Sequence, residues 1–201
     1  MRVKRRRRCE QSRCATEEES DDDSSEKENI IKTYKDTIYF RGEIKEPQAT
    51  EFCIEIRKMA EKQFDTSQGA ITLMLSSDGG DVFAGLRMYE AMKRCKVPIT
   101  VICEGCVASA ATLVMLGASQ RYMYDTTVIL VHSLKSWMAG YAKPKEIKEE
   151  LQNSETLTNI CTDVYKKHCK ITKSALTKMY DTDLYMRADQ CLRFGFVHGV
   201  L

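Results

Sequence analysis

The stretch LMLSSDGGDVFAGLRMYEAMKRCKVPITVICEGCVASAATLVML, residues 73–116, decides the fold. A buried strand predicted over 70–75 runs into the loop SSDGGD, and the helix after this loop repeats apolar residues at positions 82, 86, 89 and 92. A second strand is predicted at 99–103, and the unbroken apolar run 107–116 predicts a short buried helix. Such alternation of strand and helix predicts an α/β domain with a largely parallel sheet.

The same alternation continues on both sides of this stretch. A short strand at 38–40 and an amphipathic helix at 48–64 precede it, and a strand at 128–131 follows it and ends at His132. The longest helical pattern in the chain covers 144–168. Two shorter helices at 172–180 and 188–194, and a last strand at 197–200, complete a predicted domain that spans 37–201.

The beginning of the chain differs in composition from the rest. A basic block at 4–8 is followed at 17–28 by a run made almost entirely of acidic residues and serines. Such a segment cannot bury enough apolar surface to fold, so a disordered charged tail is predicted over 1–36. The basic block is either a nuclear address or nucleic-acid contact, or a partner for the acidic run, and the second interpretation is favoured.

Composition limits the class of protein. The 201 residues fit one globular domain, and a net charge of +2 gives no general argument for nucleic-acid binding. The sequence has no long uncharged apolar run for a membrane span and no apolar signal region at its start, which favours a cytoplasmic location. The nine cysteines are an odd number without paired spacing, and Cys103 and Cys106 form only a weak C-x-x-C. Reduced thiols, with no metal or other cofactor, are therefore expected.

Three features of the sequence can carry chemistry. Adjacent glycines at 79 and 80 free the backbone to aim N–H groups at an anion, and no Gly-Lys-Ser/Thr follows to make a phosphate-binding loop. Ser109 stands among small residues near the start of an apolar helix, where a capping serine and a nucleophile are about equally expected. His132 ends a predicted strand, where α/β proteins build sites, although a lone histidine is more often structural.

Three blocks together resemble the Clp protease proteolytic-subunit (ClpP) family. LMLSSDGGDVFAGLRMYEAMKR is similar to the family's strand, glycine turn and helix, ICEGCVASAATLVMLGA to its Gly-x-x-x-Ser segment, and ILVHSL to the strand that ends in the catalytic histidine. The segment 183–186 and the ending FGFVHGVL resemble the close of the family's sequences. The phrase GGDVFAGL is also close to the Clp-like head-maturation proteases of tailed phages. The resemblance covers roughly 37–201.

The resemblance implies a ClpP/crotonase-like fold of βαβ units in which the longest helix protrudes as a handle. It implies an ATP-dependent serine endopeptidase in which Ser109 is the nucleophile, His132 the general base and Asp183 the residue that orients the histidine. The N–H groups of Gly80 and Ala110 correspond to the family's oxyanion hole. The implied partners are a protein or peptide substrate, further copies of the chain in a ring such as a double heptamer, and an AAA+ Clp ATPase.

The chain also departs from the family. Asp78 replaces the proline of the glycine turn, Ser133 and Leu134 follow the histidine in place of Gln-Pro, and Thr182 stands where a charged residue usually precedes the triad aspartate. The charged tail replaces the segment that forms the family's axial loops, so docking to an ATPase is left open. Two alternatives remain: a ring subunit without activity, against which the complete triad argues, and a crotonase-type acyl-CoA enzyme, which needs a glutamate that the start of the Ser109 helix lacks.

Overall fold

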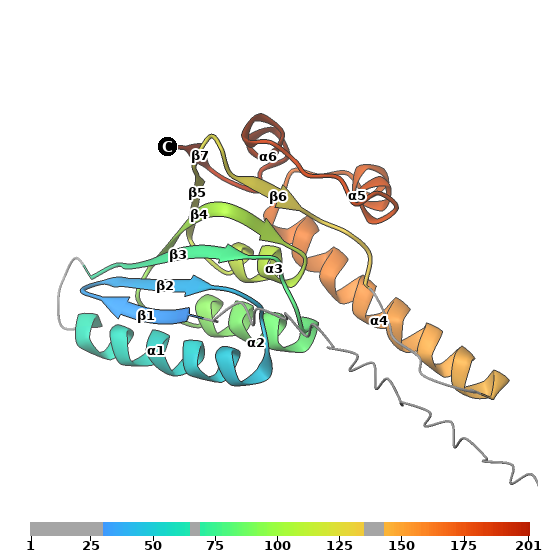
Figure 1. The fold of residues 1–201 in the computed structure, drawn as a ribbon, viewed down its shortest axis with the longest axis horizontal. Coiled ribbons are helices and arrows are strands. Elements are labelled where there is room, and N and C mark those ends of the chain that lie inside the picture. Colours follow the sequence, from blue (N-terminus) through green and yellow to red (C-terminus); the bar gives the residue numbers. More distant parts are fainter. Residues whose placement is uncertain (1–29, 65–68, 135–142) are drawn as a thin grey trace, which may run out of the picture.

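The computed structural model describes residues 30–64, 69–134 and 143–201 (Figure 1). Within these ranges the sheet has the strand order β1-β2-β3-β4-β5-β7, and β6 pairs with β4; β1 is antiparallel to β2, and the other strand pairs are parallel. The strands are β1 (Ile30–Tyr34), β2 (Thr37–Arg41), β3 (Ile71–Ser77), β4 (Ile99–Ala108), β5 (Gln120–Met123), β6 (Val128–Leu130) and β7 (Gly199–Val200). The helices are α1 (Glu46–Phe64), α2 (Val82–Lys93), α3 (Ala110–Leu116), α4 (Pro144–His168), α5 (Lys173–Tyr180) and α6 (Ala188–Phe194). The predicted α/β architecture is therefore confirmed.

The strand β4 is long because its two parts pair with two different neighbouring strands. Its residues 100–103 pair with β5, and its residues 106–108 pair with β6. Gly105, with a φ of 60°, lies between the two paired parts, and this left-handed backbone favours glycine. The strand can therefore change its neighbour and still continue to Ala108, one residue before Ser109.

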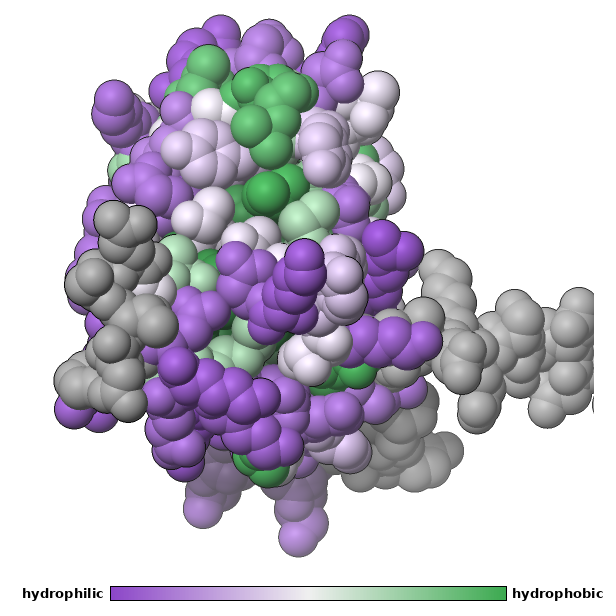
Figure 2. All heavy atoms as spheres, turned by 90° about the vertical axis from the view of Figure 1, so that its left-hand side faces the viewer, coloured by the Kyte–Doolittle hydropathy of each residue, from purple (hydrophilic) through white to green (hydrophobic). Residues whose placement is uncertain are grey.

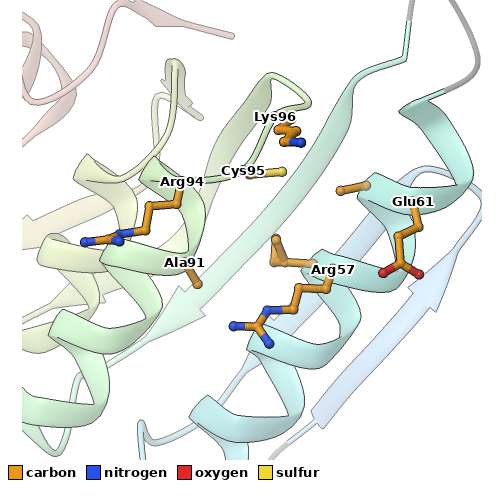
Figure 3. Close-up of a pocket in the computed structure, with 8 residues that line it drawn as sticks. Arg57, Glu61, Ala91, Arg94, Cys95 and Lys96 are labelled. Atoms are coloured by element: carbon orange, nitrogen blue, oxygen red, sulfur yellow. The ribbon is translucent and has the colours of Figure 1, made fainter.

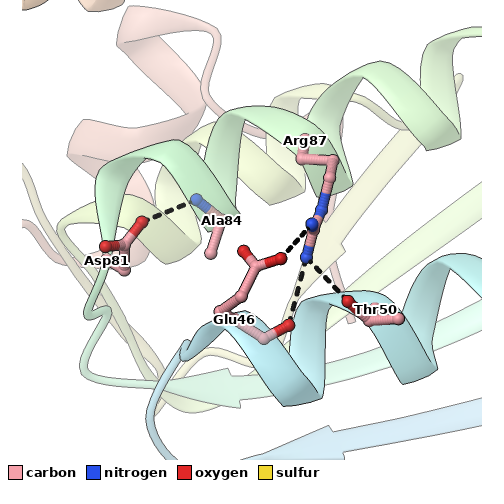
Figure 4. A network of polar contacts seen from close by, with 5 residues as sticks. All are labelled: Glu46, Thr50, Asp81, Ala84 and Arg87. Carbon is pink, nitrogen blue, oxygen red and sulfur yellow. Dashed lines mark hydrogen bonds and ion pairs between the residues drawn. The ribbon is translucent and has the colours of Figure 1, made fainter.

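Helices α1 and α2 lie next to each other against one face of the sheet (Figure 1). The guanidinium of Arg87 on α2 pairs with the carboxylate of Glu46 on α1, and it donates to the Glu46 carbonyl and the Thr50 hydroxyl, each at 3.1 Å (Figure 4). The carboxylate of Asp81 caps α2 by accepting from the Ala84 N–H at 2.7 Å (Figure 4). These contacts fix the helix that follows the glycine turn.

Helix α4 packs on the domain through its C-terminal half. Its buried residues, Cys161, Val164 and Tyr165, all belong to this half. In the other half, Ile147 and Leu151 are 51% and 59% exposed, and this part projects away from the sheet (Figure 1). The protruding handle helix implied by the resemblance is therefore present, with the predicted bounds.

A buried arginine joins the ends of two helices. Arg121 on β5 is 4% exposed, and its guanidinium donates to the carbonyls of Phe196 at 2.8 Å, His168 at 3.2 Å and Gly195 at 3.3 Å. His168 ends α4 and Gly195 follows α6, so both helices turn their partly negative C-terminal ends toward this cation. The contacts hold the C-terminal segment on the sheet.

The structure differs from the predicted secondary structure in several places. Residues 30–34 form β1, paired with β2, so the ordered sheet begins earlier than the predicted boundary at 37; residues 1–29 of the predicted tail lie outside the described residues. Val107 and Ala108, predicted as the start of a helix, extend β4 instead. The strand β5 was not expected from the sequence.

Figure 2 views the molecule from the side on which the C-terminus lies. Hydrophilic residues cover most of this face, and hydrophobic residues reach the surface mainly in a strip that runs from its top down to about the middle. Among the described residues no helix is both long enough and apolar enough to cross a bilayer.

Candidate active site

Ser109 occupies a sharp turn between β4 and α3. Its φ of 55° and ψ of −127° are unusual for a residue with a side chain, and a backbone of this kind costs about 1–3 kcal/mol. The Ser109 N–H donates to the carbonyl of Leu130 on β6 at 2.9 Å, which anchors the turn to the neighbouring strand. The side chain makes no capping hydrogen bond with α3, so the capping role that the sequence left open finds no support. A strained turn from strand to helix is the setting in which hydrolases expose a nucleophilic serine.

The glycine turn packs directly against Ser109. Gly79 has a φ of 100°, and a Cβ atom at this position would lie 2.6 Å from the Ser109 Cβ. Gly80 has a φ of 143° and lies beside Ile44, whose N–H donates to the Gly79 carbonyl at 2.7 Å and whose carbonyl accepts from the Asp81 N–H at 2.8 Å. A side chain at Gly79 would push the turn away from the serine, and one at Gly80 would clash with the Ile44 backbone, so both close approaches require glycine.

His132 follows β6 and is half-buried. Its Nδ1 is buried and has no hydrogen-bond partner in the structure, which is costly for a polar atom. His132 and Ser109 line the same cavity, whose volume is about 810 Å³, together with Gly80 and Ala110. The structure thus brings together four of the five predicted site residues.

Asp183, the fifth, is exposed in the segment between α5 and α6 and is not part of the cavity wall. Three residues further on, Met186 forms an antiparallel bridge with Ile129, with hydrogen bonds of 2.7 and 3.0 Å. Because residues in an antiparallel pair run in opposite directions, the same register continued for three residues would bring Asp183 opposite His132. Among the described residues the pairing stops at this isolated bridge, and Asp183 does not hydrogen-bond to Nδ1.

The far wall of the cavity comes from α4 and α5, and the sequence analysis assigned no role to its residues. Asn153, Leu157, Cys161 and Tyr165 recur at helical spacing on α4, and this periodicity was the available signal. Burial raises the pKa of Cys161 to about 11, so its thiol is protonated at neutral pH and is a poor nucleophile. This favours Ser109 as the nucleophile of this cavity.

No group of three or more histidine, cysteine, aspartate or glutamate side chains among the described residues is arranged to hold a metal ion. Cys103 of the C-x-x-C pair is fully buried, and this burial raises the pKa of its thiol strongly. Cys103 is therefore a protonated core residue, which does not suit a metal ligand.

A second cavity, of about 510 Å³, lies between α1 and α2 (Figure 3). Its lining includes Arg57, Glu61, Arg94 and the half-buried Cys95, and it contains neither a serine nor a histidine. It lacks the serine and the histidine that line the cavity at Ser109, so the cavity at Ser109 is the candidate active site.

An α/β fold with a serine at a strained strand–helix turn, a histidine on the same cavity wall and backbone N–H groups beside them defines a hydrolase of the serine type. Comparison with known proteins agrees with this class. The Clp protease family model matches residues 22–201, so the chain belongs to the Clp protease family, a family of proteases.

Individual relatives are distant. The ATP-dependent Clp protease proteolytic subunit of Deinococcus radiodurans is 25% identical over 171 residues, which cover 83% of this chain and 81% of that protein. The subunit of the same name from Mesostigma viride is 26% identical over 168 residues, which cover 83% of this chain and 72% of that protein. The solved structure of a ClpP1 mutant from Listeria monocytogenes superposes with a TM-score of 0.73 at 21% identity, covering 83% of this chain and 91% of that chain, which establishes the shared fold.

Proposed function

We propose that this protein is a serine endopeptidase in which Ser109 is the nucleophile and His132 the general base. The observation that carries the proposal is the placement of Ser109: its backbone is strained, its side chain caps nothing, and it shares a cavity wall with His132. Strain of this kind persists where the surrounding structure enforces it, and such positions cluster at active sites.

The proposed reaction uses these groups in turn. The Ser109 hydroxyl attacks the carbonyl carbon of the peptide bond while His132 accepts its proton, and the carbonyl oxygen becomes an oxyanion. The N–H groups of Gly80 and Ala110 stabilise this charge, each by about 3 kcal/mol. His132 then returns the proton to the leaving amine, and a water molecule repeats the sequence to release the acyl group from the serine.

Asp183 is proposed to orient His132. A carboxylate opposite the histidine would accept a hydrogen bond from Nδ1–H, keep the other ring nitrogen free to act as base and stabilise the imidazolium. This contact would also satisfy the buried Nδ1, which is otherwise without a partner. Apo active sites often have such contacts too long, and they close in the complex with substrate.

The substrate is proposed to be an unfolded or partner-delivered protein cleaved inside a chamber built from several copies of the chain. The exposed apolar residues of the projecting part of the handle, Ile147 and Leu151, lie one turn apart on one side of the helix and support an assembly, because neighbouring apolar residues exposed on a helix suit an interface. The relatives are named as proteolytic subunits of ATP-dependent proteases, and for this chain we propose the same dependence on an AAA+ ATPase.

Labelling with a fluorophosphonate tests the proposal. The probe should modify the peptide that carries Ser109, and Ser109→Ala should abolish both the label and peptide cleavage. Ser119→Ala is the matched control because Ser119 is exposed at the other end of α3, and this variant should label like the wild type. If Ser109→Ala keeps the label, another nucleophile is at work. If the wild type is not labelled at all, the chain is a ring subunit that keeps the fold without peptidase activity.

A further inference from the structure

A buried hydrogen-bonded chain leads from α4 to the carbonyl of Ser109. The Thr112 hydroxyl lies 2.6 Å from the Ser109 carbonyl oxygen and 2.5 Å from the Tyr165 hydroxyl. The Thr112 N–H also donates to the same carbonyl at 3.0 Å. Thr112 is fully buried and Tyr165 is 4% exposed, so solvent has little access to these contacts.

The direction of each hydrogen bond follows from what each group can do. The Ser109 carbonyl can only accept, so the one proton of the Thr112 hydroxyl is directed to it. The Tyr165 hydroxyl must then donate to the Thr112 oxygen. Burial raises the pKa of Tyr165, which keeps its hydroxyl protonated and able to donate.

A threonine hydroxyl that bonds a carbonyl one turn earlier is common in helices and by itself means little. Here the threonine is also held by a tyrosine 53 residues away, on a different helix. The carbonyl that receives both Thr112 hydrogen bonds belongs to the residue with the strained backbone.

The peptide plane connects this carbonyl to the reaction. The Ser109 carbonyl and the Ala110 N–H belong to one planar, trans peptide unit, so the N–H points away from the carbonyl along nearly the same line. A carbonyl fixed by Thr112 therefore fixes the direction of the Ala110 N–H, which the proposed function assigns to the oxyanion hole.

We propose that Thr112 and Tyr165 are positioning residues that aim the Ala110 N–H at the oxyanion. This inference rests on the proposed function, because it needs Ser109 as nucleophile. Neither residue touches the reacting atoms through the hydrogen bonds described. Both act through the peptide unit that joins Ser109 to Ala110.

Two variants test the pair. Thr112→Val keeps the shape but removes the hydroxyl, and Tyr165→Phe removes its donor. We expect Thr112→Val to lower kcat for a short peptide about tenfold or more with KM nearly unchanged, since a misaimed donor loses part of the 10²–10³-fold effect of a deleted one. Tyr165→Phe should have a smaller effect in the same direction, and Thr112→Ser should restore most of the lost kcat.

Two controls repeat these changes away from the site. Thr127→Val removes a buried hydroxyl that donates to the Cys103 carbonyl at 3.1 Å, and Tyr89→Phe removes a buried phenol that contacts His168 at 2.9 Å. Both should lower the melting temperature like the test variants and leave kcat unchanged. A peptide aldehyde, which forms an oxyanion with the serine, should bind about tenfold more weakly to Thr112→Val, whereas a non-covalent product peptide should bind equally well.

The outcomes separate this inference from the proposed function. If the wild type is not labelled at Ser109 by a fluorophosphonate, the proposed function fails and the inference fails with it. If Ser109 is labelled but Thr112→Val loses no more kcat than Thr127→Val, Thr112 is a structural residue and the positioning inference alone is overturned. An equal loss in Thr112→Ser and Thr112→Val would also overturn it, because the hydroxyl would then be irrelevant.

Discussion

Replacing Gly79 by alanine tests whether the close contact between the glycine turn and Ser109 is needed for activity. The new Cβ would lie 2.6 Å from the Ser109 Cβ and 2.8 Å from the Ala108 carbonyl oxygen. To bring the first contact from 2.6 Å to an ordinary 3.4 Å, turn and serine must separate by about 0.8 Å. A misplacement near 1 Å costs about 10²-fold in rate, so kcat/KM should fall about 10²-fold.

Stability should fall as well. Alanine at a φ of 100° costs about 1–3 kcal/mol, and forcing a methyl group into a packed site adds about 1–3 kcal/mol. A domain of this size has about 5–15 kcal/mol in total, so the variant should fold but melt at a clearly lower temperature.

Gly105→Ala is the matched control. Gly105 has a φ of 60°, and the atom nearest to the Cβ of an alanine at this position would be the Ser76 Oγ at 3.6 Å, so this variant has the backbone strain without the clash. It should lose about 1–2 kcal/mol and keep its turnover. Thermal denaturation and cleavage of a fluorogenic peptide, measured on both variants, separate the two effects. Equal turnover in Gly79→Ala and Gly105→Ala would refute the argument from close contact.

Further predictions concern the site, the handle, a half-buried histidine and the tail. Asp183→Asn should fold normally and lose about four orders of magnitude in kcat if Asp183 orients His132; near-full activity would assign this role to another carboxylate. Leu151→Glu should shift the assembly toward smaller species in light scattering, because it places a charge beside Ile147 on the handle, whereas Glu149→Gln, on the opposite side of the same helix, should not. Burial, together with the positive charges of Lys93, Arg121 and Lys167, lowers the pKa of His168 from 6.5 to about 4. Between pH 4 and pH 6.5 the folded state therefore binds fewer protons than the unfolded state, so the stability of the fold should fall as the pH drops from 6.5 to 4. In thermal melts, His168→Gln should make the melting temperature depend less on pH over this range. Deletion of residues 1–29 should leave cleavage of a fluorogenic tetrapeptide unchanged or faster, and less sensitive to salt, since none of the proposed catalytic groups lies there; loss of cleavage with the assembly intact would contradict this.

The sequence predicted the parts of the fold that depend on local patterns. The handle at 144–168 and the helix at 188–194 were found to the residue, because apolar periodicity and terminal signals such as Gly195 mark them clearly. The start of α3 was placed too early because a continuous apolar run does not distinguish a buried strand from a buried helix. The strand β1 was missed because its charged and polar residues, Lys32 and Thr33, lie exposed on the edge of the sheet next to a charged tail.

The residues of the candidate site, like the elements of the fold, were predictable from the sequence only where the signal is local. Ser109 and His132 could be proposed from local signals, because Ser109 stands among small residues in an apolar run and His132 ends a predicted strand. The contact between Thr112 and Tyr165 joins residues 53 positions apart, and no local sequence pattern predicts a hydrogen bond between side chains on two different helices. The proposed role of Asp183 rests on the bridge between Ile129 and Met186, which no local sequence pattern predicts.

That bridge also limits how the chain can tolerate insertions and deletions. His132 lies three residues after Ile129, and Asp183 lies three residues before Met186. The bridge therefore fixes how many residues separate each of them from the paired positions. One residue added or removed in either of these intervals would shift a side chain by about 3.4 Å along the strand direction and turn it to the opposite face. Under the proposed role of Asp183, the segment between Asp183 and Met186 should tolerate substitutions at the exposed Leu184 and Tyr185 but no change in its length.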